Sequence, residues 1–111
     1  MTLREESVRG ITVLEVDGRI DSGTAPVLDE RLSTLFTGPG HRLVLDLGRV
    51  EYISSAGFRV LLLAGRHATR EGGQLVLCAM SAKVRQLFEI TDFLDLFTVC
   101  GSRTDGLAAL A

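Results

Sequence analysis

Cysteine is scarce in this sequence, which has only Cys78 and Cys100 among its 111 residues. Each lies in an apolar, strand-like run, LVLCA or LFTVC, and no histidines cluster beside them. Two cysteines in this setting provide neither a disulfide framework nor the ligand set of a zinc site. We therefore expect two buried free thiols and no bound metal.

A surplus of positive charge and a long apolar run are also missing. The chain has 12 Lys and Arg residues against 14 Asp and Glu, a formal net charge of -2, so little charge is available to neutralise nucleic-acid phosphates. No apolar run approaches the roughly 20 residues needed to cross a bilayer. The opening MTLREESVRG resembles neither a secretory signal nor a transit peptide. We expect a cytoplasmic protein that binds a protein or small ligand, not nucleic acid or membrane.

Motifs for nucleotide or cofactor chemistry are absent as well. No G-x-x-x-x-G-K-[ST] loop and no G-x-G-x-x-G turn follows a predicted strand. Asp21 and Asp46 could lie near each other at strand ends. Two carboxylates without a third ligand, however, are more typical of turns and helix caps than of a metal site. We expect no cofactor.

The residues that are present are typical of one globular domain, with 46% hydrophobic and 23% charged residues. Residues 3–8 and 11–17 flank the turn Arg9-Gly10 and predict an antiparallel hairpin. Short apolar runs predict three further strands, at residues 43–47, 74–79 and 96–99.

Helical periodicity alternates with these strands. The first helix, predicted to end before residues 37–40, has its apolar residues at helical spacing: Ala25, Leu28, Leu32, Leu35 and Phe36. A second runs from Ala56 to about Arg70, a third is opened by Ser81, and a terminal one is opened by Ser102. This order predicts an α/β fold, a mixed sheet with an N-terminal hairpin and later parallel strands joined by crossover helices.

Two adjacent serines, Ser54 and Ser55 in the stretch YISSAGF, lie between a strand and the second helix. A nucleophile elbow would need a glycine two positions before the serine, which is missing. A general base is missing too, because His67 is twelve residues along the same helix, about 18 Å away, and nothing aims His41 at Ser55. Ser54 is placed to cap the helix, which leaves Ser55 either without a role or available to a partner or as a phosphoacceptor.

A helical wheel of the second helix predicts its two faces. The core face is predicted to hold Phe58, Leu61, Leu62, Gly65 and Thr69. The opposite face holds Arg59, Leu63, Arg66, His67 and Arg70. A leucine among arginines is either an ordinary isolated apolar residue on the surface or an anchor for a partner with an acidic rim.

The run LVLDLGRVEYISSAGFRVLL, with VDGRIDSGT before it and LVLCAMSAKVRQLFEI after it, resembles the STAS domain of bacterial anti-sigma factor antagonists. The most specific parts are residues 46–57, which follow the pattern D-L-x-x-V-x-[YF]-I-x-S-x-G, and the turn from Gly18 to Thr24. The resemblance covers nearly the whole chain. It implies a single STAS domain over residues 1–111.

The resemblance also implies a partner switch. In this family an anti-sigma factor that is also a serine kinase phosphorylates the serine two positions before the motif's glycine, here Ser55. The unphosphorylated antagonist binds the anti-sigma factor and frees the sigma factor, and a PP2C-type phosphatase resets the phosphorylated form. This chain has Ser54 where many members have Asp and Ala56 where many have Ser or Thr. Other STAS domains are constitutive adaptors in complexes unrelated to sigma factors, which is the alternative function.

We therefore expect a binding protein without enzymatic activity, monomeric when free, whose partners are an anti-sigma factor kinase and a PP2C-type phosphatase. The expected binding surface joins residues implied by the resemblance to the outer face of the second helix. It comprises Gly18, Asp21, Thr24, Ser54, Ala56, Gly57, Arg59, Leu63 and Arg66, with Ser55 as the phosphorylation site.

Overall fold

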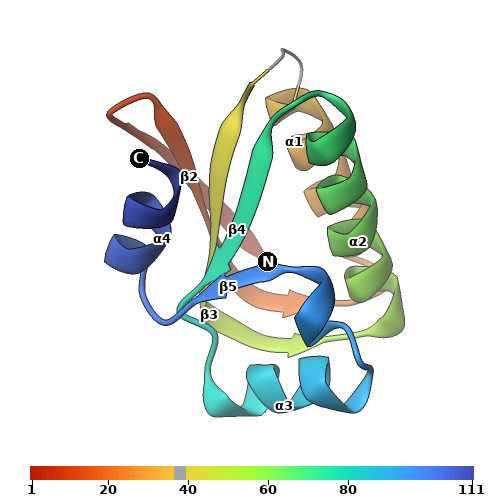
Figure 1. Ribbon diagram of the computed structural model, residues 1–111. Coiled ribbons are helices and arrows are strands. Elements are labelled where there is room, and N and C mark those ends of the chain that lie inside the picture. The colour runs from red at the N-terminus through yellow and green to blue at the C-terminus, as the bar shows by residue number, and fades with distance from the viewer. Residues whose placement is uncertain (37–39) are drawn as a thin grey trace.

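A five-stranded sheet with strand order β1-β2-β3-β4-β5 lies at the centre of the computed structural model, which describes residues 1–36 and 40–111 (Figure 1). β1 (Thr2–Val8) and β2 (Ile11–Ile20) form an antiparallel hairpin. β3 (Arg42–Ile53), β4 (Gln74–Cys78) and β5 (Thr98–Cys100) are then added in parallel. The predicted mixed sheet with an N-terminal hairpin is confirmed.

Helices cover both faces of this sheet. The three helices on one face connect the parallel strands, which need crossover connections, and the C-terminal helix covers the other face. α1 (Ala25–Leu35) and α2 (Ser55–Arg70) pack against each other on one face, and α3 (Ala82–Ile90) packs on β3. The short α4 (Arg103–Leu110) lies on the opposite face (Figure 1). The predicted stop of the first helix at residues 37–40 falls mostly outside the described residues. No helix in the described part of the chain is long and apolar enough to span a membrane.

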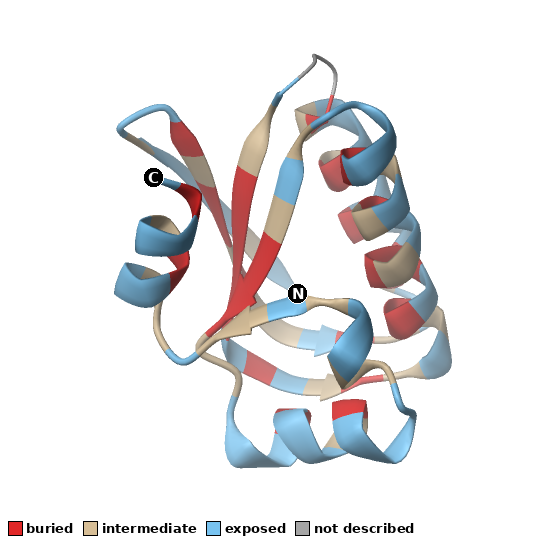
Figure 2. Ribbon diagram, in the orientation of Figure 1, coloured by how far each residue is buried: buried red, intermediate tan, exposed pale blue. Residues whose placement is uncertain are grey.

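Alternation along the strands produces two apolar clusters of different size. The main core fills the space between the sheet and α1, α2 and α3, and includes Leu14, Ile20, Leu45 and Ile53. The smaller cluster lies between the sheet and α4 and comprises Ile11, Val13, Val44, Val76, Cys78 and Leu110. In Figure 2 the buried residues accordingly lie along the strands and on the inward sides of the helices.

Three strands differ from their predicted bounds by more than one residue. β2 continues to Ile20 instead of ending at residue 17. β3 continues to Ile53 instead of ending at residue 47, since polar residues on its second half alternate with the buried Val50 and Ile53 and hide the strand pattern. β5 begins at Thr98 instead of residue 96, because Leu94–Leu96 form a single 3₁₀ turn, η1. That turn leaves Leu96 59% exposed.

Both cysteines are free thiols, as predicted. Cys78 is fully buried, but the predicted burial of Cys100 was wrong, because this residue is only half-buried at the edge strand β5. Burial, followed by the nearby Asp46 carboxylate, raises the pKa of the Cys78 thiol to about 12. Cys78 therefore stays protonated and behaves as a small apolar residue under α4.

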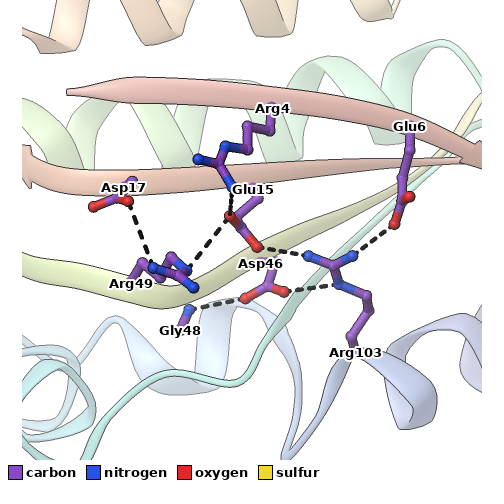
Figure 3. Close-up of polar contacts among 8 residues, drawn as sticks. All are labelled: Arg4, Glu6, Glu15, Asp17, Asp46, Gly48, Arg49 and Arg103. Atoms are coloured by element: carbon purple, nitrogen blue, oxygen red, sulfur yellow. Dashed lines mark hydrogen bonds and ion pairs between the residues drawn. The ribbon is translucent and has the colours of Figure 1, made fainter.

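Arg103, the first residue of α4, connects this helix to three strands (Figure 3). Its guanidinium donates to Glu6 on β1 at 2.6 Å, to Glu15 on β2 at 2.8 Å and to Asp46 on β3 at 2.9 Å. Asp46 is 7% exposed, and its second oxygen accepts a hydrogen bond from the Gly48 N–H. Asp46 is the register partner of Glu15, whereas Asp21 follows Ile20 at the far end of β2. The two carboxylates therefore do not form a common site.

Candidate functional site

The strands β2 and β3 end side by side, which brings two distant segments of the chain together. Ile20 and Ile53 are register partners at the carboxyl ends of these strands. The Ser54 N–H donates to the Ile20 carbonyl oxygen at 2.8 Å. The turn at residues 21–24 and the beginning of α2 therefore lie next to each other, as the sequence motifs require.

Ser54 is the N-cap of α2, as predicted. Its backbone is extended, with φ -86° and ψ 174°, and its hydroxyl accepts a hydrogen bond from the Gly57 N–H at 3.4 Å. This satisfies one of the backbone donors that a helix leaves free at its first turn.

Replacing Ser54 with alanine is expected to lower the free energy of unfolding by about 1 kcal/mol, because the cap is lost while the helix remains. Ser55→Ala, one residue further on, is the matched control and should change stability by less than about 0.5 kcal/mol. Urea unfolding of both variants measures the difference. Equal losses would show that Ser54 contributes no capping energy.

Ser55 is the first residue of α2 and is exposed. Within residues 1–36 and 40–111 its hydroxyl makes no hydrogen bond. It lies at the positive end of the helix dipole, where N–H groups of the first turn are available to an anion. Arg59 follows one turn later and is also exposed. The hydroxyl is thus open to a partner and its surroundings favour negative charge.

Gly57 allows α2 to begin this close to β2. A β-carbon at this position would lie 2.8 Å from the Cγ2 atoms of Ile20 and Ile53 and 2.9 Å from the Ile20 carbonyl oxygen. No side chain larger than hydrogen fits at these distances without movement of the helix. Gly57 is buried and therefore positions Ser55 rather than offering a contact surface of its own.

The turn beside Ser55 is tied together by Asp21 and Thr24. The Asp21 carboxylate accepts from the N–H groups of Gly23 at 3.0 Å and Thr24 at 3.1 Å, and the Thr24 hydroxyl accepts from the Asp21 N–H and donates to the Arg19 carbonyl. Hydrogen bonds from the backbone N–H of Thr24, and then from that of Gly23, lower the pKa of the Asp21 carboxyl below its ordinary value of 3.8. Its contribution to stability is therefore complete above that pH and lost as the pH falls below it.

Gly18 and Arg19 bend the end of β2 towards this turn. Gly18 has a φ of +111°, which favours glycine, and the register with β3 shifts between Gly18 and Arg19. Arg19 then stacks on the ring of Tyr52, 4.6 Å from its centroid, and pairs with Asp21 at 3.8 Å. Sequence reasoning gave Arg19 and Tyr52 no role at the site, although both lie within the two motifs.

The outer face of α2 extends the site away from Ser55. Arg59, Leu63 and Arg66 are exposed, and Leu63 is 45% exposed. Starting from Ser55, these residues follow one another at steps of four, four and three residues, which places them along one face of the helix. Ala56, beside Ser55, is half-buried. The helix has no acidic residue, so this face is basic although the whole chain carries a net charge of -2.

The predicted core face of α2 was partly wrong. Phe58 and Leu61 are buried, but Leu62 and Gly65 are only half-buried and Thr69 is exposed. The buried residues are Gly57, Phe58, Val60, Leu61, Ala64 and Ala68. The core face is therefore rotated towards the small residues, because close packing of α2 against α1 and the sheet favours alanine and glycine at the contact.

The two histidines have structural partners. His67, predicted on the outer face, is half-buried, and its Nε2 donates to the Phe36 carbonyl oxygen at 3.1 Å. His41 lies 3.1 Å from the Thr12 hydroxyl. His67 is also separated from Ser55 by about 18 Å of helix. The arrangement around Ser55 thus favours recognition or modification over nucleophilic catalysis.

Comparison with known proteins places this chain in a family. Residues 3–105 match the STAS domain. BtrV of Bordetella bronchiseptica, provisionally named an anti-sigma factor antagonist, is 39% identical over 98% of this chain and 94% of its own. The anti-sigma-B factor antagonist of Listeria monocytogenes is 34% identical over 76% of this chain and 74% of its own.

A solved structure agrees with these sequence relatives. The crystal structure of an anti-sigma factor antagonist from Mycobacterium paratuberculosis superposes with a TM-score of 0.85, at 28% identity, over 98% of this chain and 92% of that one. The motif residues, the fold and the relatives therefore agree. The chain belongs to the STAS-domain family of anti-sigma factor antagonists.

Proposed function

We propose that this protein is an anti-sigma factor antagonist that binds an anti-sigma factor with serine kinase activity and thereby releases a sigma factor. Phosphorylation of Ser55 ends this binding, and a PP2C-type phosphatase restores it. The observation that supports the proposal best is that the two serines differ in their surroundings. Ser54 caps α2, whereas Ser55 is exposed beside the Asp21 turn. The protein would act in the cytoplasm as a single STAS domain over residues 1–111, monomeric when free.

A phosphate on Ser55 would change the surface more than the fold. The helix N-terminus favours its negative charge, and Arg59 one turn later can add a charge-assisted contact. Release of the partner then follows from like-charge repulsion, desolvation and the bulk of the phosphate at the contact surface. Ser55→Asp reproduces this only in part, because it carries a single charge.

An in vitro phosphorylation assay with the cognate anti-sigma factor kinase tests the proposal. The wild-type protein and Ser54→Ala should each gain one phosphate, mapped to Ser55, and Ser55→Ala should gain none. Phosphate on Ser54 would overturn the assignment of the acceptor. Binding to the kinase without any phosphate transfer would instead support a constitutive adaptor.

Amide chemical shifts before and after phosphorylation test the local mechanism separately. We expect changes only near residues 18–24 and 54–63, because the folded state already accommodates an anion at the start of α2. Changes spread across the sheet would show that the phosphate acts through a conformational change.

Leu63→Ala is expected to weaken binding to the anti-sigma factor by about 1–2 kcal/mol, since it removes an exposed apolar anchor without leaving a cavity. The melting temperature should be unchanged, in contrast to the loss of 2 kcal/mol or more that is typical of a buried leucine. Isothermal titration and thermal unfolding measure the two effects. Unchanged affinity would mean that Leu63 is an ordinary surface residue.

Arg66→Glu, on the same face, is expected to act mainly on the association rate. A charge at the rim of an interface steers encounter more than it holds the complex. The slowing should therefore diminish as salt is added. A salt-independent increase of the dissociation rate would place Arg66 inside the contact instead of at its rim.

A further inference from the structure

The outer edge of β4 is only partly covered. β5 pairs with Val76, Leu77 and Cys78, so Gln74 and Leu75 have no strand on their outer side in the described part of the chain. Figure 1 shows β5 beside only the carboxyl-terminal part of β4. The short β5 and the turn η1 that precedes it leave this opening.

A groove of about 620 Å³ follows this open edge. Its apolar lining includes Leu62 from α2, Leu75 from β4, and Leu96 and Phe97 from the segment before β5. Leu96 is 59% exposed, although burying a leucine side chain away from water is favourable. The volume is in the range of sites that hold a small ligand or a few side chains of a partner.

The charge of the groove points to the chemistry of its occupant. Arg66 and Arg70 line it, and none of its described lining residues is acidic. Neither arginine takes part in the ion pairs found among residues 1–36 and 40–111. Two unpaired arginines beside an apolar surface complement carboxylates flanking an apolar side chain.

We propose that this groove binds an extended acidic peptide segment of a partner protein. An apolar side chain of the segment lies between Leu62 and Leu96, carboxylates contact Arg66 and Arg70, and its backbone runs beside the open edge of β4. A second copy of this chain fits less well, because the arginines of two such grooves would face each other.

This groove is separate from the proposed phosphorylation site, although it shares Arg66 with the proposed anti-sigma factor surface. Ser55 and Arg70 are at opposite ends of α2, about 22 Å apart along the helix axis. The inference does not rest on phosphorylation of Ser55, so each proposal can fail without the other.

An NMR titration with a blocked peptide of sequence Asp-Leu-Glu-Val-Asp tests the inference. Saturable amide shifts are expected at residues 62–75 and 96–98, and a Lys-Leu-Lys-Val-Lys peptide should cause none there. Arg70→Glu should weaken binding about tenfold. Arg9→Glu, at the exposed hairpin turn, makes the same change in net charge and should alter the affinity by less than about twofold.

Three results would overturn the inference. One is that the acidic peptide causes no saturable shift in the groove, or shifts residues around Ser55 instead. Another is that Arg9→Glu weakens binding as much as Arg70→Glu, which would show attraction by net charge alone. The last is concentration-dependent shifts at residues 62–75 without peptide, which would make a second copy of the chain the occupant.

Discussion

Replacing Arg103 with methionine is expected to lower the free energy of unfolding by about 3 kcal/mol, and the midpoint of thermal unfolding by about 12 °C. The substitution preserves most of the side-chain volume but removes the partner of a buried carboxylate. Asp46 would keep its hydrogen bond from Gly48 and lose the one at 2.9 Å from Arg103. A carboxylate that is 7% exposed cannot recover the lost interaction from water.

The loss should be specific to this cluster (Figure 3). Arg31→Met is a matched control. Among residues 1–36 and 40–111 Arg31 pairs with Glu5 alone, at 3.4 Å, and both side chains are about 40% exposed. Such a pair contributes less than about 0.5 kcal/mol. If Arg103→Met lowers stability no more than Arg31→Met, the cluster is a surface feature and not the attachment of α4.

A second substitution separates the ion pair with Asp46 from the other ion pairs of Arg103. Asp46→Leu in the Arg103→Met background removes the unpaired carboxylate and should recover part of the stability, since apolar replacements of buried ion pairs are often neutral. If the double variant is instead as unstable as the sum of the two single variants, Arg103 contributes mainly through its contacts with Glu6 and Glu15.

Local patterns in the sequence predicted most of the fold. The hairpin, the alternation of strands and helices, and the caps Ser54, Ser81 and Ser102 all appear in the structure. These features depend on near neighbours in the chain, which a single sequence displays. The late start of β5 was missed because LFTV is equally apolar whether its first residue forms a strand or a 3₁₀ turn.

Contacts between distant segments could not be predicted in the same way. An acidic residue inside the apolar run LVLDL signals that Asp46 needs a partner, but nothing in the sequence selects Arg103, 57 residues later. The rotation of α2 was missed for a related reason. Ala64 and Ala68 are weakly apolar, and only their contacts with α1 and the sheet show that they face the core.

Gly57→Ala is expected to disturb the proposed switch without removing the acceptor hydroxyl of Ser55. The new β-carbon would lie 2.9 Å from a backbone oxygen and 2.8 Å from two methyl groups, so the first turn of α2 must move away from β2. We expect a loss of about 2 kcal/mol in stability, as for other overpacked sites. Ser55 moves with the helix, and phosphoryl transfer to it should slow by at least about tenfold, because this step depends on precise positioning.

Gly65→Ala in the same helix is the matched control, with the opposite expected sign. Its β-carbon would meet only the Phe97 Cε1 atom, at 3.8 Å, which is an ordinary contact. Alanine is the better helix former, so stability should rise by about 0.5–1 kcal/mol, and phosphorylation of Ser55 should be unchanged. Chemical unfolding and the initial rate of phosphate incorporation measure both variants. If Gly57→Ala also gains stability and keeps its rate, α2 can shift freely at its N-terminus, and the close approach to Ile20 does not position Ser55.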